Sequence, residues 1–145
     1  MEIQDAEFRH STPVQIRFTD IDMLGHLNNA IYTQFMDQAK VEYFTEVSHE
    51  PIDWNEINLV IANINTNFLA QTHLGEHLEV LTRVESIGNK SLVLHQRVIN
   101  SDTGQVKADG HTVMVAVNLK TGETIPVQEK WRKAMAEFEG STLDR

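Results

Sequence analysis

The chain has 145 residues and no cysteine, and its 21 acidic against 12 basic side chains give a formal net charge of −9. This length fits one domain with its own core, and the missing cysteine excludes disulfides, thiolate nucleophiles and cysteine-based zinc sites. The acidic balance argues against a nucleic-acid partner, which needs clustered basic side chains. No apolar run reaches transmembrane length and no apolar signal core is present, so we expect a cytoplasmic protein with no membrane partner.

The first half of the chain predicts one strand followed by one long helix. Residues 1–13 form a polar lead-in, and residues 14–18 alternate between apolar and polar as a half-buried strand does. The helix follows Asn28, a good N-cap whose side-chain oxygen can accept a hydrogen bond from a first-turn amide, and it runs to about Val47. Residues 49–58 have no clear period and are predicted to form a connecting loop. The buried face of the helix is expected to carry apolar residues three and four positions apart: Tyr32, Phe35, Met36, Ala39 and Tyr43.

The second half predicts four strands and a short helix. Residues 59–69 alternate between an apolar face, expected to be buried, and a row of asparagines at 63, 65 and 67. Strands are also predicted from residues 78–84, 92–98 and 106–119, the last of them central or facing a partner subunit. Turns at 72–76, 88–91 and 101–104 favour hairpins, which makes the four strands antiparallel neighbours. Residues 127–139 have the spacing of an amphipathic helix that ends at Gly140.

Residues with chemical potential gather in the loop before the long helix. Asp20, Asp22 and His26 precede a helix N-terminus, whose free N–H groups and partial positive charge can polarise a carbonyl. Asp22 can act as a general base or a nucleophile, or it can simply close an Asx-turn. Asp20 is expected to hold loop amides. His26 can orient Asp22 or a substrate carbonyl, or it can bond to the backbone, and Gly25 is expected to adopt a positive φ.

The element order and the segment DIDMLGHLNNAIY at residues 20–32 resemble the hotdog-fold acyl-CoA thioesterases, in the branch similar to 4-hydroxybenzoyl-CoA thioesterase. The resemblance covers residues 14–126. It implies an α+β hotdog fold in a single domain over residues 1–145, with a long central helix wrapped by a curved antiparallel β-sheet in the order strand, helix, four strands, and with a short C-terminal helix.

The same resemblance implies an activity and an assembly. Asp22 corresponds to the catalytic carboxylate of the family, and the backbone N–H near Asn29 corresponds to the group that polarises the thioester carbonyl. The substrate is then an acyl-CoA, with no cofactor, and the chain forms a homodimer or homotetramer with active sites at the subunit interface. The open alternatives are a non-catalytic acyl-CoA-binding or regulatory protein, an acyl-carrier-protein thioesterase, and a hydratase or dehydratase.

Further residues are expected to contact the substrate. Gly25, Asn28 and Tyr32 lie within the motif, although Asn28 also serves as the helix cap. Because coenzyme A carries phosphates, basic contacts are expected, with Lys90 and Ser91 of the hairpin turn as the first choice. The other basic candidates are Arg97, Lys107 and the cluster Lys130, Arg132 and Lys133. The remaining histidines at 73, 77, 95 and 111 are expected to be structural, surface or interface residues, and no metal site is predicted.

Overall fold

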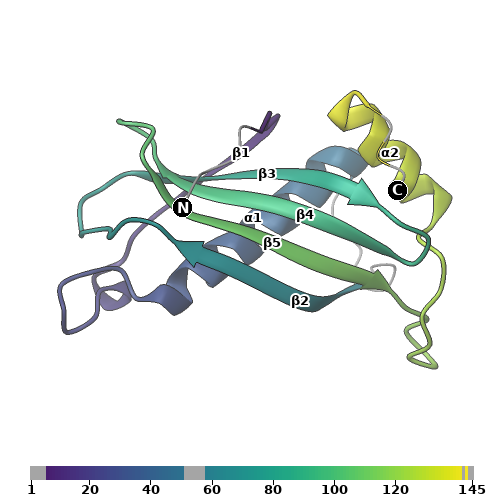
Figure 1. Ribbon diagram of the computed structural model, residues 1–145, viewed down its shortest axis with the longest axis horizontal. Helices are drawn as coiled ribbons and strands as arrows, with labels where there is room; N and C mark the ends of the chain where they lie inside the picture. The colour runs from purple at the N-terminus through teal and green to yellow at the C-terminus, as the bar shows by residue number, and fades with distance from the viewer. Residues whose placement is uncertain (1–5, 51–57, 142, 144–145) are drawn as a thin grey trace.

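One antiparallel sheet with a long helix across one of its faces makes up this protein, and the computed structural model describes residues 6–50, 58–141 and 143 (Figure 1). The order is strand, helix, four strands, short helix, which is the predicted hotdog arrangement. The strands are β1 (His10–Val14), β2 (Leu59–Phe68), β3 (Leu78–Ile87), β4 (Ser91–Asn100) and β5 (Val106–Ala116), and the helices are α1 (Asn29–Ser48) and α2 (Glu129–Glu139).

Helix α1 begins after its predicted N-cap and ends at Ser48, one residue beyond the predicted end near Val47. Asn28 is the N-cap, and its side-chain oxygen accepts a hydrogen bond from the Ala30 N–H at 3.0 Å. Its C-cap is His49, which has a left-handed φ of 60°. The predicted apolar face is confirmed as buried: Tyr32, Phe35, Met36, Ala39 and Tyr43 are each no more than 6% exposed. This helix face lies against β1, β3 and β4.

The core divides into two clusters at the two ends of α1. The cluster near the helix start joins Leu27, Tyr32 and Phe35 to Leu78 and Val98 of the sheet. The second cluster joins the end of α1 to the far ends of β3, β4 and β5 and to α2, through residues that include Tyr43, Phe44, Ile87, Leu92 and Met135. Burying an apolar side chain of this size contributes about 1.5–3 kcal/mol. The cluster near the helix start therefore supports the motif loop, which contributes Leu27 to it.

The strand order is β1-β3-β4-β5-β2, which corrects one predicted pairing. β3, β4 and β5 are joined by the expected hairpins, but β2 pairs with β5 and not with β3. The segment between β2 and β3 is long enough to cross the sheet. It is held there because the N–H groups of Leu69 and Ala70 donate to the Lys107 carbonyl at the start of β5, and Thr72 accepts from Leu27 N–H.

The first strand also differs from its prediction. β1 spans His10–Val14, whereas residues 1–13 were expected to be a lead-in; Phe18 begins a 3-10 helix, Phe18–Asp20. Pro13 suggests a strand boundary in the sequence, yet here it lies within β1. β1 is an edge strand, and an edge tolerates a residue that has no N–H to donate.

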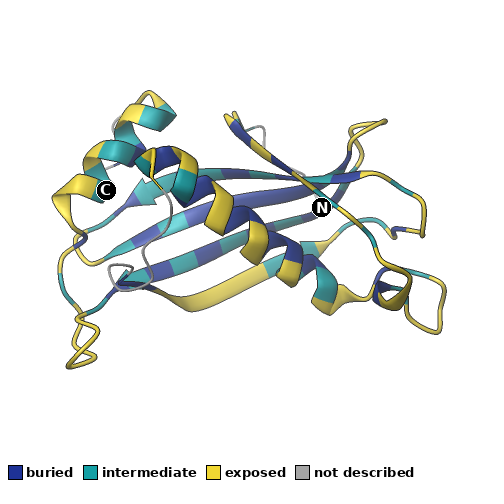
Figure 2. Ribbon diagram, turned by 180° about the vertical axis from the view of Figure 1, so that it is seen from behind, coloured by how far each residue is buried: buried dark blue, intermediate teal, exposed yellow. Residues whose placement is uncertain are grey.

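The predicted buried face of β2 is exposed in the single chain. A register shift between Ile61 and Asn63 moves Val60 and Ile64 to opposite sides of the sheet, because their partners Val115 and Thr112 lie on opposite faces of β5. Both apolar residues are more than 40% exposed. On the face that carries α1, the helix lies against β1, β3 and β4 and leaves most of β2 uncovered (Figure 2).

Three points remain: the second helix, the loop at residues 49–58 and the length of the helices. Helix α2 spans Glu129–Glu139 and ends at Gly140, which has a φ of 72°, as the sequence predicts. The predicted loop at 49–58 falls largely outside the described residues. Among the described residues, no helix has both the length and the apolar character needed to cross a membrane.

Candidate active site

The motif loop is a tight turn built by its own backbone. The Asp22 N–H donates to the His26 carbonyl at 2.9 Å, and the Gly25 N–H donates to the Asp22 carbonyl at 3.0 Å. Gly25 has a φ of 81°, a conformation that costs glycine little and other residues more. Leu24 N–H donates to the Asp22 carboxylate at 2.9 Å, so Asp22 does close an Asx-turn. One carboxylate oxygen is thereby held, and the side chain is exposed.

Asp20 is the structural member of the aspartate pair. Its side chain is 1% exposed and accepts hydrogen bonds from both the backbone and the guanidinium of Arg17, the shortest at 2.9 Å. These hydrogen bonds from Arg17 lower the pKa of Asp20. The Asp20 carbonyl accepts from the N–H of Asn28, which fixes the loop to the start of α1. Of the loop amides that it was predicted to hold, the Asp20 side chain binds one, the N–H of Arg17.

A cavity of about 400 Å³ opens between the motif loop, the first turn of α1 and the segment after β2. Five predicted site residues line it together, and Gly25 shapes the turn beside them. The lining residues are Asp22, Leu24, His26, Leu27, Asn28, Asn29, Tyr32, Phe68, Leu69, Ala70 and Gln71. The tertiary structure thus places a carboxylate and a helix N-terminus on the same cavity.

The backbone N–H of Asn29 is the open donor of this helix end. The Ala30 N–H donates to the Asn28 side chain and the Ile31 N–H donates to the Asn28 carbonyl. Within the described part of the chain the Asn29 N–H has no acceptor. A first-turn amide without a partner, in a residue that lines a cavity, is suited to bind an oxygen that gains negative charge.

His26 lines the cavity but does not hydrogen-bond to Asp22 through its side chain. Its ring packs edge-on against the ring of His73, with 5.0 Å between centroids. His73 in turn lies 3.6 Å from the Glu76 carboxylate. The structure therefore brings a second histidine to the site, which the spacing of His73 and His77 in the sequence did not indicate.

The opposite wall of the cavity comes from residues that the sequence analysis did not select. Phe68 packs against the Tyr32 ring at 5.5 Å, and the Tyr32 hydroxyl lies 2.8 Å from the Thr72 hydroxyl. Tyr32 is 2% exposed, so it serves as a fixed wall. Residues 68–71 were predicted as the end of a strand and the residues before a turn, and no site role was predicted for them.

Lys107 is unavailable to a phosphate, which corrects one of the predicted basic contacts. It is 3% exposed and its ammonium group donates to the Gln71 carbonyl and to Glu76, both at 2.8 Å. Partial burial acts to raise the pKa of Glu76, but hydrogen bonds from Lys107, from the His73 N–H and from Asn100 lower this pKa to about 2. The buried pair fixes the wall segment to the start of β5.

Lys90 and Ser91 lie at the other end of the sheet from the cavity. The Lys90 carbonyl accepts from the N–H of Ala116 at the end of β5, and Ser91 pairs with Val115. The cavity wall is tied to the opposite end of β5, at Lys107. Within one chain these two residues are therefore not brought to the site.

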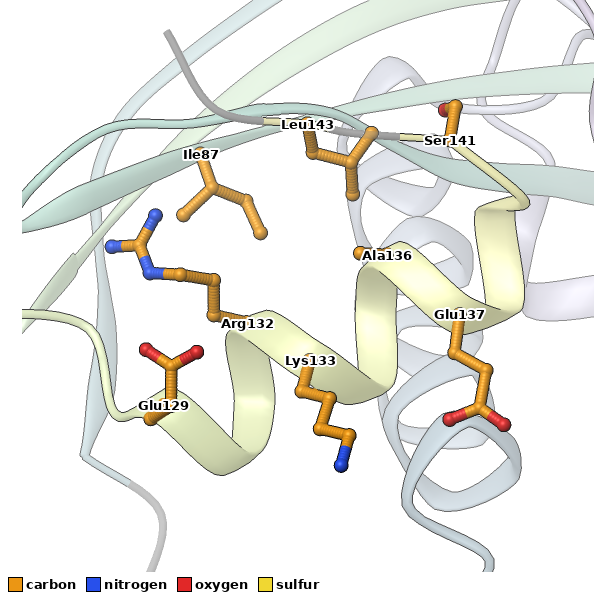
Figure 3. A pocket seen from close by; sticks show the side chains of 8 residues that line it. All are labelled: Ile87, Glu129, Arg132, Lys133, Ala136, Glu137, Ser141 and Leu143. Carbon is orange, nitrogen blue, oxygen red and sulfur yellow. The ribbon is translucent and has the colours of Figure 1, made fainter.

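A second cavity, of about 600 Å³, lies beside α2 (Figure 3). Ile87 and Leu143 face Ala136 across it, while the charged ends of Lys133 and Glu137 point away. Arg132, on the same wall, donates to the Gly88 carbonyl at 2.8 Å. The first cavity, with its carboxylate and open amide, has the chemistry of an active site, and this one does not.

Comparison with known proteins agrees with the fold. A family model for the thioesterase-like superfamily matches residues 16–135. The long-chain acyl-CoA thioesterase FadM of Escherichia coli is 26% identical over 88% of this chain and 97% of its own length. A thioesterase from Thermus thermophilus, solved in complex with coenzyme A and zinc, is 30% identical over 92% of this chain and 96% of its own, with a TM-score of 0.82.

A predicted thioesterase from Bacillus stearothermophilus is 26% identical with a TM-score of 0.80, and it covers 88% of this chain and 94% of its own. The match of the family model over most of the chain and the agreement in fold lead to the same assignment. The chain belongs to the thioesterase-like superfamily and is a hotdog-fold thioester hydrolase.

Proposed function

We propose that this protein hydrolyses acyl-CoA thioesters to a free acid and coenzyme A, with Asp22 as the reacting carboxylate. The observation that carries the proposal is the shared cavity of Asp22 and the open N–H of Asn29. Thioester hydrolysis needs an activated oxygen nucleophile and a donor for the oxyanion. This cavity supplies one residue of each kind, and the relatives named as acyl-CoA thioesterases support the substrate class.

In this mechanism the thioester carbonyl oxygen accepts from the Asn29 N–H at the positive end of α1. Asp22 either removes a proton from a water that attacks the carbonyl carbon, or attacks it directly to form an anhydride that water then opens. In both routes the carbon–sulfur bond breaks and the coenzyme A thiolate leaves. Loss of one oxyanion donor costs about 10²–10³ in kcat, and a general base contributes about 10²–10⁴.

A second copy of the chain completes the site in this proposal. β2 has a strand neighbour on one side only among the described residues, and its exposed apolar side chains lie along the free edge. An uncovered apolar edge strand pairs readily with another strand, and antiparallel pairing with its own copy obeys two-fold symmetry. Phe68, at the end of β2, also lines the cavity, so the pairing edge runs to the site.

This pairing accounts for the distant position of Lys90 and Ser91. In an antiparallel β2–β2 pair, Phe68 of one chain lies near Leu59 of the other. Leu59 pairs with Ala116, and Ala116 is bonded to the Lys90 carbonyl. Lys90 and Ser91 of the second chain then lie at the cavity end of the first, where they can contact the phosphates of coenzyme A.

The test is the release of free thiol from a panel of aliphatic and aromatic acyl-CoA substrates. Asp22→Asn is expected to lower kcat by about 10²–10⁴. Its fold should be unaffected, because its side chain is exposed and holds only the Leu24 N–H within the described residues. Asp102→Asn is the matched control: it removes another exposed loop carboxylate, which does not line the cavity, and should leave kcat unchanged.

Three outcomes contradict the proposal. Wild-type protein that binds acyl-CoA without turnover is a binding protein, and turnover confined to acyl-carrier-protein thioesters changes the substrate class. Activity that survives in Asp22→Asn but is lost in His26→Ala moves the role of base to His26.

A further inference from the structure

A polar cluster lies on the outer face of the sheet, opposite α1 and away from the cavity. His95 of β4 and His111 of β5 are direct cross-strand partners, and Arg83 of β3 is the partner of His95 on the other side. Glu85 lies in the register shift between Val84 and Ser86. Such a bulge re-aims side chains, and here the carboxylate of Glu85 joins the two histidines.

The ligand atoms of this cluster are close enough to share one ion. One atom each from Glu85, His95 and His111 lie within 4.8 Å of one another, and the His111 Nε2 lies 3.5 Å from the Glu85 carboxylate. Around a tetrahedral zinc ion with bonds of about 2.0–2.1 Å, ligand atoms are about 3.4 Å apart. The His111 ring stacks on the His95 ring, with 4.4 Å between centroids and 10° between planes, so the His111 side chain has to turn for both rings to bind one ion. The side chains of Glu85 and His111 are 35% and 41% exposed, which leaves room for this adjustment.

His95 is already oriented as a ligating histidine. Its Nε2 lies 2.8 Å from the Asp109 carboxylate, which also accepts from Arg97. With an ionised acceptor the proton resides on Nε2, and Nδ1 presents its lone pair to the side of Arg83 and Glu85. A histidine that donates to a carboxylate while its other nitrogen binds the ion is the usual arrangement at zinc sites.

A cation already occupies the position between these ligands. The guanidinium of Arg83 donates to the His95 Nδ1 at 3.2 Å and to the Glu85 carboxylate at 3.3 Å. The guanidinium of Arg83 is therefore hydrogen-bonded to two of the three side chains that would bind a metal ion. The Arg83 side chain is 23% exposed, and its guanidinium also lies 5.9 Å from the centre of the Phe8 ring, so an ion that displaces it has to break this contact as well.

We propose that Glu85, His95 and His111 form a binding site for a divalent transition-metal ion, with Asp109 orienting His95 and Arg83 competing for the same ligand atoms. Two imidazole nitrogens and a carboxylate are a donor set that Zn²⁺ accepts, and a solvent molecule can fill the fourth position. The three ligands come from three adjacent strands. Metal binding therefore links β3, β4 and β5 and stabilises the folded chain, independently of the thioesterase reaction.

The test titrates the full chain, stripped with a chelator, with Zn²⁺ alone near neutral pH in a calorimeter. Wild-type protein is expected to bind one ion and to gain thermal stability as zinc is added. His111→Ala is expected to weaken binding by more than tenfold, and Asp109→Asn by about tenfold or more, the usual effect of losing an orienting partner. Arg83→Met, which removes the competing charge, is expected to tighten binding.

The matched control is His73→Ala. His73 also lies beside another histidine, His26, and close to a carboxylate, so adventitious zinc has a comparable place to bind. This variant should keep the wild-type affinity. Zinc binding that is unchanged in His111→Ala, or that is lost in His73→Ala, overturns the proposal, as does a wild-type protein that shows no saturable binding.

A variant that fails to fold would lose zinc binding for a reason unrelated to its ligands, so folding is tested first. Each variant is checked first by its melting temperature in chelator. Where His111→Ala is unfolded, Glu85→Gln replaces it, since this partly exposed side chain keeps its size and loses its charge. Glu85→Gln is also expected to bind zinc more than tenfold more weakly, and wild-type affinity in that variant overturns the site.

Discussion

Two aspartates of the motif loop have the same chemistry and different surroundings. Asp20 is buried and bound by the backbone and the guanidinium of Arg17, whereas Asp22 is exposed on a cavity and bound by one loop amide. Both carboxylate oxygens of Asp20 accept hydrogen bonds from Arg17, whereas only one oxygen of Asp22 accepts a hydrogen bond within the described residues. The division of labour between the two residues follows from their contacts.

At the same scale, Glu76 makes stability depend on pH. Its pKa is lowered from an ordinary value of 4.5 to about 2, so the stability it contributes is complete above pH 4.5 and is lost as the pH falls toward 2. Glu76→Gln is expected to lower the free energy of unfolding at neutral pH and to flatten its fall between pH 4.5 and 2. Urea unfolding across that range measures both effects.

Glu7→Gln is the control for this experiment, because Glu7 is a largely exposed carboxylate with a surface ion pair. Its unfolding curves should match wild type at every pH. Equal pH dependence in wild type and Glu76→Gln would contradict the role given to the Lys107 pair.

At the scale of elements, one hydrogen-bonded carboxylate joins α1, α2 and β3. The Tyr43 hydroxyl donates to Glu139 at 2.7 Å, and the Val84 N–H donates to the same oxygen at 3.1 Å. Burial, and then the charge of Glu139, raise the pKa of Tyr43, so the hydroxyl keeps its proton throughout the ordinary pH range. The bond therefore secures α2 to the core at any working pH.

Tyr43→Phe removes this bond and keeps the ring. We expect the free energy of unfolding to fall by about 1–2 kcal/mol, because a hydrogen bond to a charged group is lost while Glu139 keeps the Val84 N–H. Glu139→Gln, which keeps an acceptor, should cost less. Denaturant unfolding of the three proteins measures the difference, and a Tyr43→Phe variant as stable as wild type would contradict the link.

At the scale of the whole molecule, the exposed edge at β2 is the feature that one chain leaves unexplained. Val60, Ile61, Ile64 and Phe68 are each 42–46% exposed along this strand. Exposed apolar side chains on a free edge are a liability unless another chain covers them. In the proposed dimer, the second chain covers these apolar side chains and completes the cavity.

Ile64→Lys tests this assembly. A charge on the edge strand is expected to convert a dimer or larger assembly into single chains, which sedimentation measures. Because the second chain completes the cavity in the proposal, the rate of thiol release from acyl-CoA is expected to fall as well. Leu119→Lys, at an equally exposed apolar position outside β2, should change neither. A wild-type chain that sediments as a single copy at all concentrations, or an Ile64→Lys variant with wild-type mass and activity, would contradict the assembly.

Much of this protein follows from its local sequence. The N-cap at Asn28, the buried face of α1, the hairpins of β3–β5 and the positive φ of Gly25 are decided by interactions within a few residues, so periodicity and turn chemistry predict them. The motif from Asp20 to Tyr32 is also local, which is why five of its predicted residues meet in one cavity.

Other features were decided only by contacts between distant residues. The pairing of β2 with β5 and the edge position that admits Pro13 belong to the strand order of the sheet, and the exposure of β2 follows from its place at the other edge, away from most of α1. The cavity wall at residues 68–71, the burial of Lys107 and the meeting of Glu85 with two histidines join segments from separate strands. No local pattern encodes such encounters, because the free energy that selects them arises when the strands and the helix pack together.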